Sequence, residues 1–161
     1  MLNRTAEDWQ RLGHLPTLLE ALPALVRELG FRYYRFSFAS CTHAVSAGNL
    51  VTGSEAIIQA ALDLRAHHLQ RSNFPLIWEP KAFATAPSLW AQAQRLGLRH
   101  GWLQPLHEGV AHSCLALLRP HVSVSATEHY QNAASALWLG EFLHRTAAQS
   151  DAALKSNRGC V

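Results

Sequence analysis

Histidines and cysteines are the residues of this 161-residue chain whose types first suggest chemistry, ten of the former and three of the latter. His67 and His68 are adjacent, so they diverge on a helix. His100, His107 and His112 lack the short spacings that metal ligands need. The sequence contains neither the Gly-x-Ser-x-Gly turn of many hydrolases nor the Gly-Lys-Ser/Thr of a phosphate-binding loop. We therefore expect no metal, no cofactor and no catalytic residue, and we predict that the protein is not an enzyme.

Hydrophobic periodicity predicts the elements that would position any other site. Residues 31–38 alternate with a period of two, which places Tyr34, Phe36 and Phe38 on one face of a strand. Residues 39–53 are either a loop or a pair of strands. The order of elements predicts an α/β (α+β) fold, an α-β-α sandwich with a central antiparallel sheet and helices on both faces. Helical periodicity covers 5–12, 17–29, 54–70, a segment from 85 or 88 to 96, and 125–148; further strands are expected at 100–106 and 111–119.

Composition places the chain among ordinary globular domains. Hydrophobic residues make up 48% and charged residues 16% of it, which excludes a disordered chain. The net charge of +3 comes from basic residues spread along the sequence, so we expect no direct DNA binding. The three cysteines lie far apart, which favours reduced thiols in the cytoplasm. No apolar stretch is long enough for a signal peptide or a membrane span.

Five short segments stand out together: 29–31 (Leu-Gly-Phe), 78–80 (Trp-Glu-Pro), 94–101 (Gln-Arg-Leu-Gly-Leu-Arg-His-Gly), 104–107 (Gln-Pro-Leu-His) and 113–117 (Ser-Cys-Leu-Ala-Leu). Together they resemble the autoinducer-binding domain of LuxR-type quorum-sensing regulators. The similarity is densest from Trp78 to Leu117 and runs in order over roughly residues 15 to 148. That family binds an N-acyl homoserine lactone between the sheet and the helices, and it is used as a dimer.

The resemblance implies a set of ligand-binding residues. In the family an Asp accepts the ligand amide N–H and a Trp packs beside the lactone ring; these roles fall on Asp63 and Trp78. We expect a mostly apolar pocket with Asp63 at its polar end. Its expected lining comprises Tyr34, Phe36, Asp63, Trp78, Leu89, Trp90 and Ala116.

The sequence departs from the family pattern where the remaining polar contacts are made. A Tyr and a second Trp, from an Asn-Tyr-Pro-x-x-Trp motif, donate to the ligand carbonyls in the family. Residues 45–50 (Val-Ser-Ala-Gly-Asn-Leu) hold neither, and Leu64 replaces the Pro that follows the Asp. A second alignment of the family motif is possible, because residues 73–78 (Asn-Phe-Pro-Leu-Ile-Trp) resemble Asn-Tyr-Pro-x-x-Trp. Loss of two hydrogen bonds would weaken binding by about tenfold to a hundredfold.

Two functions from different classes follow. The first is a module that binds a small-molecule signal, an acyl homoserine lactone or a related apolar amide, for transcription regulation. The alternative is a ligand-independent antiactivator that forms heterodimers with full-length LuxR-type regulators. Residues 1–148 are expected to form the sensor domain and residues 149–161 a flexible tail, with no helix-turn-helix reader.

The last predicted helix carries the expected partner surface. Trp138, Leu139, Phe142 and Leu143 span more than the stripe of about 100° that a sheet can bury. We expect Leu139 and Leu143 to stay exposed and to support a homodimer or a heterodimer. Alternatively, the first short helix, which carries Trp9, covers this face within one chain.

Overall fold

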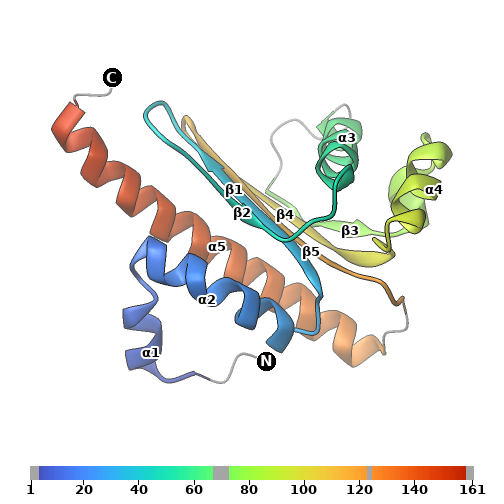
Figure 1. The fold of residues 1–161 in the computed structure, drawn as a ribbon, viewed down its shortest axis with the longest axis horizontal. Coiled ribbons are helices and arrows are strands. Elements are labelled where there is room, and N and C mark those ends of the chain that lie inside the picture. Colours follow the sequence, from blue (N-terminus) through green and yellow to red (C-terminus); the bar gives the residue numbers. More distant parts are fainter. Residues whose placement is uncertain (1–3, 67–72, 123–124, 159–161) are drawn as a thin grey trace.

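A five-stranded antiparallel sheet lies between two layers of helices in the computed structural model, which describes residues 4–66, 73–122 and 125–158 (Figure 1). All four strand pairs are antiparallel, in the order β2-β1-β5-β4-β3, so the predicted α-β-α sandwich is confirmed. The strands are β1 (Tyr33–Ala39), β2 (Ala44–Gly48), β3 (Leu76–Trp78), β4 (His100–Glu108) and β5 (Ala111–Arg119). The helices are α1 (Ala6–Arg11), α2 (Leu15–Glu28), α3 (Ser54–Ala66), the 3-10 helix η1 (Pro80–Phe83), α4 (Pro87–Arg95) and α5 (Ala126–Arg158).

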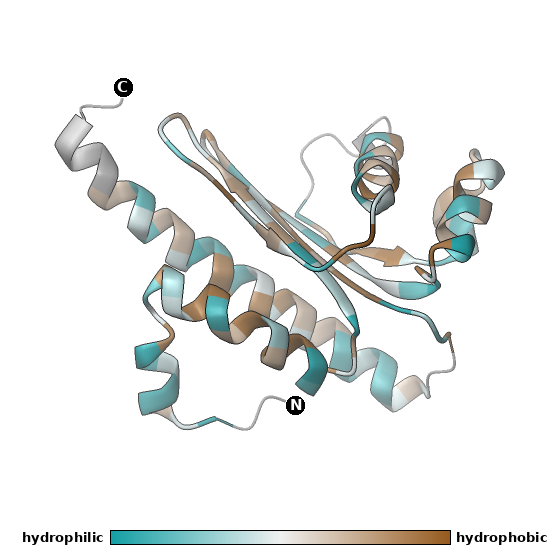
Figure 2. Cartoon of the chain, in the orientation of Figure 1, coloured by the Kyte–Doolittle hydropathy of each residue, from teal (hydrophilic) through white to brown (hydrophobic). Residues whose placement is uncertain are grey.

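The two faces of the sheet carry separate apolar cores. α1, α2 and α5 cover one face, while α3, η1 and α4 cover the other (Figure 1). Successive residues of a strand point to opposite faces, so each inner strand supplies both cores. Figure 2 shows hydrophobic colour along much of the strands and mostly hydrophilic colour on α1. The α2/α5 core includes Leu18, Leu22, Leu25, Tyr34, Phe36, Phe38, Leu115 and Leu117; the α3/α4 core includes Ile57, Ile58, Trp78, Phe83, Leu98, Leu103, Ala116 and Leu118.

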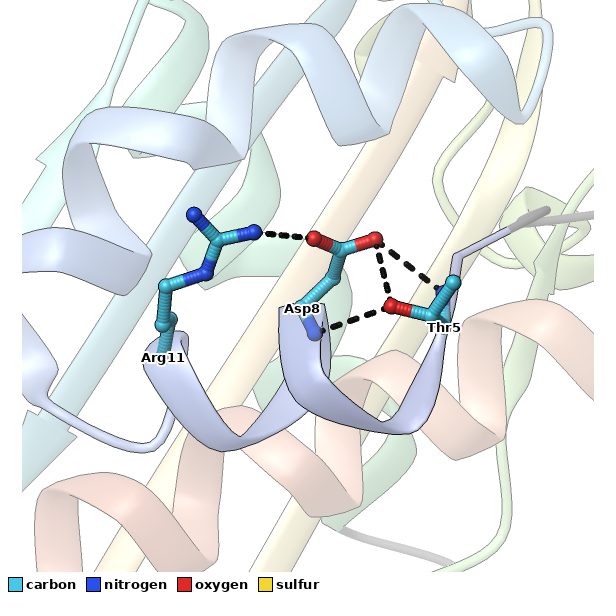
Figure 3. Close-up of polar contacts among 3 residues, drawn as sticks. All are labelled: Thr5, Asp8 and Arg11. Carbon is cyan, nitrogen blue, oxygen red and sulfur yellow. Dashed lines mark hydrogen bonds and ion pairs between the residues drawn. The ribbon is translucent and has the colours of Figure 1, made fainter.

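The start of α1 is fixed by a capping interaction between Thr5 and Asp8. The backbone N–H of Asp8 donates to Thr5 Oγ1 over 3.2 Å, and the Thr5 backbone N–H donates to Asp8 Oδ2 over 3.1 Å (Figure 3). The Arg11 guanidinium pairs with the other carboxylate oxygen (Figure 3). These hydrogen bonds lower the pKa of Asp8, so the cap holds at neutral pH.

α2 begins earlier than predicted, whereas α3 begins where it was predicted. α2 begins at Leu15 instead of residue 17, because Pro16 is tolerated in the first helical turn, where its missing N–H has no partner to lose. α3 begins at Ser54 as predicted, and its predicted end near residue 70 lies outside the described residues. The loop or strand pair expected over 39–53 includes the edge strand β2.

α5 extends well past the end predicted for it. The sequence predicted a flexible tail from residue 149, but the helix continues to Arg158. Asp151 is buried, and its Oδ1 accepts hydrogen bonds from Ser40 Oγ and Thr42 Oγ1, both over 2.6 Å. These contacts tie the end of α5 to the β1–β2 turn, which is distant in sequence. The tail prediction is therefore wrong up to residue 158, and residues 159–161 lie outside the described residues.

The outer surface of α5 also differs from the predicted one. Leu139 and Leu143 are fully buried in the α2/α5 core, so the prediction that they stay exposed is wrong. Leu137 and Trp138 are partly exposed instead, at 39% and 38%. Trp9 of α1 packs on Trp138 with ring centroids 4.4 Å apart, so α1 covers part of this face, as the alternative expected. The sequence pattern misplaced the buried stripe because apolar residues surround α5 at this point.

The cysteines differ from the expectation of reduced thiols. Cys41, in the β1–β2 turn, is disulfide-bonded, whereas Cys114 carries a buried thiol. Cys160 lies outside the described residues. The disulfide could not be foreseen from spacing, because disulfide partners meet through the fold.

The buried His100 of β4 is expected to make the free energy of unfolding depend on pH. Burial and the positive charge of Arg119 are the two largest causes that lower the pKa of His100; His129 and His121 lower it further, and Glu128 raises it. The ordinary pKa of histidine is 6.5. Below this pH the imidazole of His100 therefore binds a proton more readily in the unfolded chain than in the folded one. We expect the free energy of unfolding to fall as the pH drops below 6.5, and His100→Gln to reduce this fall.

Urea unfolding on either side of pH 6.5 measures this effect. The difference between wild type and His100→Gln isolates His100 from the other histidines. An identical pH dependence in the two proteins contradicts the prediction.

Candidate functional site

A pocket of about 530 Å³ lies at the edge of the sheet where α3, β3 and η1 meet. Its walls are mainly small and aliphatic, and polar side chains come only from Glu79, Lys81 and Thr85 among its described lining residues. This volume and polarity suit a drug-sized ligand, because ligand pockets span roughly 300–1,000 Å³ and are mostly apolar. The apolar lining comprises Ala61, Leu64, Pro75, Leu76, Ile77, Ala82 and Ala84.

Two prolines and a buried tryptophan shape this pocket. Pro75 precedes the short edge strand β3, and Pro80 begins η1, so the chain turns sharply on both sides of Trp78. The indole N–H of Trp78 donates to the Leu98 carbonyl over 2.8 Å. Phe83 packs edge-on against Trp78 with ring centroids 4.8 Å apart. The segment that forms one wall is thus anchored in the α3/α4 core.

Four of the predicted site residues lie on the pocket side of the sheet. Trp78 and Ala116 are buried in the α3/α4 core, and Leu89 and Trp90 of α4 are partly buried against it. Trp90 lies next to Phe83, with ring centroids 5.1 Å apart. None of these four is among the described residues that line the 530 Å³ pocket. They belong to the α3/α4 core or pack against it.

Tyr34 and Phe36 do not join them. Both belong to the α2/α5 core on the opposite face of the sheet. Burial raises the pKa of Tyr34, so its phenol stays neutral. The expectation that these two residues share a pocket with Trp78 is therefore wrong. Tyr33 and Arg35 are the β1 residues that face α3, and Arg35 Nε pairs with Glu55 Oε1 over 3.2 Å.

Asp63 lies on the exposed surface of α3. Its Oδ1 accepts a hydrogen bond from Gln59 Nε2, one turn earlier, over 3.0 Å. Asp63 is not among the described lining residues, although Ala61 and Leu64 on either side of it are. The structure therefore separates this carboxylate from the pocket that its neighbours line.

Residues 73–78, the second possible match to the family's Asn-Tyr-Pro-x-x-Trp motif, form the edge strand β3 and the segment before it. Asn73 Oδ1 accepts a hydrogen bond from the His107 backbone N–H over 2.7 Å, which attaches the segment before β3 to β4. Phe74 is 74% exposed, so the aromatic residue of the string points away from the core. Asn73 thus holds the edge of the sheet together. Neither Asn73 nor Phe74 is among the described residues that line the 530 Å³ pocket, whereas Pro75, Leu76 and Ile77 of the same string are.

The sequence analysis did not identify the residues that do line it. Leu64, Leu76, Ala82 and Ala84 carry no functional group, and two of them are the smallest apolar residue that has a side chain. Only Leu76 has a sequence signal, which is its position between two prolines and before a buried Trp. That signal marks an irregular segment and does not distinguish a pocket wall from a loop.

One group of side chains has the composition of a hydrolase triad. Ser113 Oγ lies 2.7 Å from His144 Nδ1, and His144 Nε2 lies 3.2 Å from Glu108 Oε2. Ser113 is buried within the β1–β5 ladder, and it is not among the described residues that line the neighbouring 380 Å³ pocket. The three residues link α5 to the β4–β5 hairpin.

Within residues 4–66, 73–122 and 125–158, no three His, Cys, Asp or Glu side chains are grouped so that they could hold a metal ion. No helix in this part of the chain combines the length and apolar character that a bilayer span requires.

Comparison with known proteins identifies the family. The model of the autoinducer-binding domain matches residues 60–147, more than half of the chain. The transcriptional activator protein PhzR of Pseudomonas fluorescens is 30% identical over 94 residues, which cover 53% of this chain and 38% of PhzR. The chain thus spans well under half of that relative.

Solved structures share the fold. CepR2 of Burkholderia cenocepacia, an N-acylhomoserine lactone dependent LuxR family transcription factor, has a TM-score of 0.64 at 18% identity, covering 84% of this chain and 86% of CepR2. Escherichia coli SdiA has a TM-score of 0.64 at 19% identity, covering 88% of this chain and 63% of SdiA. SdiA is also known in complex with octanoyl-rac-glycerol, with a TM-score of 0.51 at 17% identity, covering 86% of this chain and 67% of SdiA. The chain belongs to the autoinducer-binding domain family of LuxR-type quorum-sensing regulators.

Proposed function

We propose that this domain binds a small, mainly apolar signal molecule in the 530 Å³ pocket between α3, β3 and η1. The observation that carries the proposal is the lining of that pocket, which is aliphatic except for three polar side chains. An acyl chain would gain roughly 0.8 kcal/mol for each buried CH₂ group, so eight carbons would contribute about 6 kcal/mol, which lies between millimolar and micromolar binding.

The head group of the ligand is expected to contribute less than it does in the family pattern. Asp63 lies outside the lining, and residues 45–50 supply no Tyr or Trp donor. An acyl homoserine lactone and an acyl compound with another uncharged polar head should therefore bind with similar affinity. The acyl chain provides most of the binding energy in this account.

A thermal-shift series tests the proposal. Octanoyl homoserine lactone and octanoyl glycerol are each added to wild type, Ala84→Phe and Asp63→Asn. Ala84 is exposed, so the larger ring fills the pocket without disturbing the core. At a ligand concentration of about 100 Kd, wild type should gain about 2.7 kcal/mol, or several degrees in Tm.

The two variants give opposite expected results. Ala84→Phe should lose the shift and keep its melting temperature without ligand, whereas Asp63→Asn should retain the shift. No shift in wild type with either compound contradicts the proposed function. If Asp63→Asn is the only variant that loses the thermal shift, Asp63 contacts the ligand, which contradicts its proposed place outside the binding site.

A second function is favoured by the outer face of α5. Tyr130, Leu137 and Trp138 are exposed on this helix, and monomeric soluble proteins rarely expose large contiguous apolar patches. We propose that this face pairs with a second copy or with a full-length LuxR-type regulator. A regulator held in such a heterodimer would not form its own homodimer, which places two DNA readers on two half-sites, so the pairing would act against activation.

The prediction is that Trp138→Glu shifts the protein from dimer to monomer. A charge at the centre of an apolar interface costs several kcal/mol, so the dimer dissociation constant should rise at least about a hundredfold. Light scattering over a range of concentrations measures it, with Arg145→Glu on the same helix as a charge control. A wild type that stays monomeric at every concentration, and captures no full-length regulator, excludes the dimer.

A further inference from the structure

The strand β2 forms one edge of the sheet, and the outer side of its backbone pairs with no other strand among the described residues. The sheet has its other edge at β3. That edge is only three residues long and directly follows Pro75, and both features hinder pairing with another chain. β2 is five residues long, and its sequence Ala-Val-Ser-Ala-Gly contains neither a charge nor a proline. The edge at β2 therefore lacks the usual protection against pairing.

Two backbone hydrogen bonds fix the alternation of the ladder between β1 and β2. The Asn49 N–H donates to the Tyr34 carbonyl over 3.1 Å, and the Ser40 N–H donates to the His43 carbonyl over 2.9 Å. Hydrogen-bonded and non-hydrogen-bonded pairs alternate along an antiparallel ladder. The register between these two bonds therefore determines which residues of β2 bond to β1.

Alternate residues of β2 direct their backbone groups to opposite sides of the strand. Val45 and Ala47 belong to hydrogen-bonded pairs, so their N–H and C=O groups point to β1. Ala44, Ser46 and Gly48 belong to non-hydrogen-bonded pairs, so theirs point away from the sheet. All three are exposed, and none of their outward groups is hydrogen-bonded to another described residue.

These outward groups are complementary to those of a second β2 strand related by a two-fold axis. When the axis passes through the strand centre, Ser46 lies opposite Ser46 of the second copy, and Ala44 lies opposite Gly48. Each of these is a hydrogen-bonded pair, so the two strands exchange about six main-chain hydrogen bonds. Opposite residues point to the same face, so Val45, which packs against the α2/α5 core, meets Ala47 of the second copy. The side chains are small and uncharged, so no like charges meet at the axis.

We propose that β2 is an interface through which two copies of this chain join their sheets by antiparallel pairing of their β2 strands. The interface is separate from the outer face of α5, because it uses the backbone of a different element. Two strands of five residues bury less than the roughly 1,600 Å² of a standard interface. The pair is therefore expected to form at high protein concentration and to exchange rapidly.

Hydrogen exchange of single amides tests this pairing with controls inside the same strand. In the whole chain, the N–H groups of Ser46 and Gly48 should exchange rapidly in dilute solution. They should exchange at least about threefold more slowly at the highest protein concentration, where the dimer prevails. The N–H groups of Val45 and Ala47 are bonded to β1, so their protection should not depend on concentration. A dimer formed only through α5 leaves the Ser46 N–H open, so the measurement distinguishes the two interfaces.

Substitutions at the centre of β2 give a second test by sedimentation. They are made in a Trp138→Glu background, which removes the contact proposed for α5. Ser46→Pro removes an outward N–H that β1 does not use, and Ser46→Lys places two like charges at the axis. Each should raise the dimer dissociation constant at least about tenfold. Thr52→Lys, at an exposed residue after the strand, is the charge control and should change it less than about twofold.

Each result either supports or overturns pairing of like copies. If Ser46→Pro fails to fold, Ser46→Lys alone is compared with Thr52→Lys. Exchange of the Ser46 and Gly48 amides at one rate over all protein concentrations overturns the proposal. Equal dimer affinity in Ser46→Lys and Thr52→Lys also overturns it. Protection of Ser46 only after a full-length regulator is added means that this edge accepts a strand of another protein, and it likewise overturns the proposal.

Discussion

Replacing Gly101 with alanine is expected to prevent this chain from folding. Gly101 lies in the middle of the sheet, opposite Leu118 on β5. A Cβ at this position would lie 1.9 Å from the Leu117 carbonyl oxygen and 2.7 Å from Leu118 Cδ2. The carbonyl belongs to the backbone of the paired strand, so it moves only if β4 and β5 separate. We expect a loss of more than about 4 kcal/mol, the range in which single changes unfold small domains.

Circular dichroism and the soluble yield measure this effect. Gly109→Asn is the control, because Gly109 lies in the β4–β5 turn at φ 60° and an added Cβ meets no atom within 4 Å. Asparagine tolerates this left-handed conformation, so the control should fold normally. A Gly101→Ala protein as stable as wild type means that β4 and β5 do not pair in this register.

Replacing Trp78 with alanine is expected to destabilise the domain by about 3–5 kcal/mol, as for other buried aromatic residues. The side chain is fully buried, packs on Phe83, and donates its indole N–H to the Leu98 carbonyl. Alanine removes the ring and leaves that carbonyl without its indole donor. Trp78→Phe retains most of the packing and loses the hydrogen bond, so a smaller loss of about 1–3 kcal/mol is expected.

Urea unfolding of these variants gives the free energies directly. Phe74→Ala is the control, because a ring that is 74% exposed contributes within about 0.5 kcal/mol. If Trp78→Ala unfolds at the same urea concentration as Phe74→Ala, Trp78 does not anchor the α3/α4 core. The expected instability also means that loss of ligand binding in Trp78→Ala does not identify a ligand contact.

The layered fold was predictable because periodicity reports burial. Tyr34, Phe36 and Phe38 alternate along the chain, and they are buried on one face of β1. The pattern does not report which helices cover that face. Tyr34 and Phe36 therefore were assigned to a pocket, although they belong with Phe38 to the α2/α5 core.

α5 shows the same limit for a helix. Trp138, Leu139 and Leu143 are all apolar, so their sequence does not decide which of them faces the sheet. The structure buries the two leucines and leaves the larger tryptophan partly exposed beneath Trp9. The long-range contacts of Asp151 with Ser40 and Thr42, which extend the helix, have no local sequence signal.

The candidate site was less predictable than the fold. Family spacing placed a ligand contact on Asp63, but this residue lies on the exposed side of α3 and pairs with Gln59. The walls of the proposed pocket are residues such as Leu76 and Ala84, whose role depends on where β3 and η1 lie in space. Small apolar side chains become a binding site only through the shape of the fold.

The location of the bound signal tests this account most directly. Methyl groups of Leu64 and Leu76 line the 530 Å³ pocket, whereas those of Leu18 and Leu22 lie in the α2/α5 core. In methyl NMR spectra recorded during addition of octanoyl glycerol, we predict shifts that saturate at Leu64 and Leu76 and no shifts at Leu18 and Leu22. Shifts confined to the α2/α5 core, or no shifts at any of the four leucines, would contradict the proposed signal-binding site.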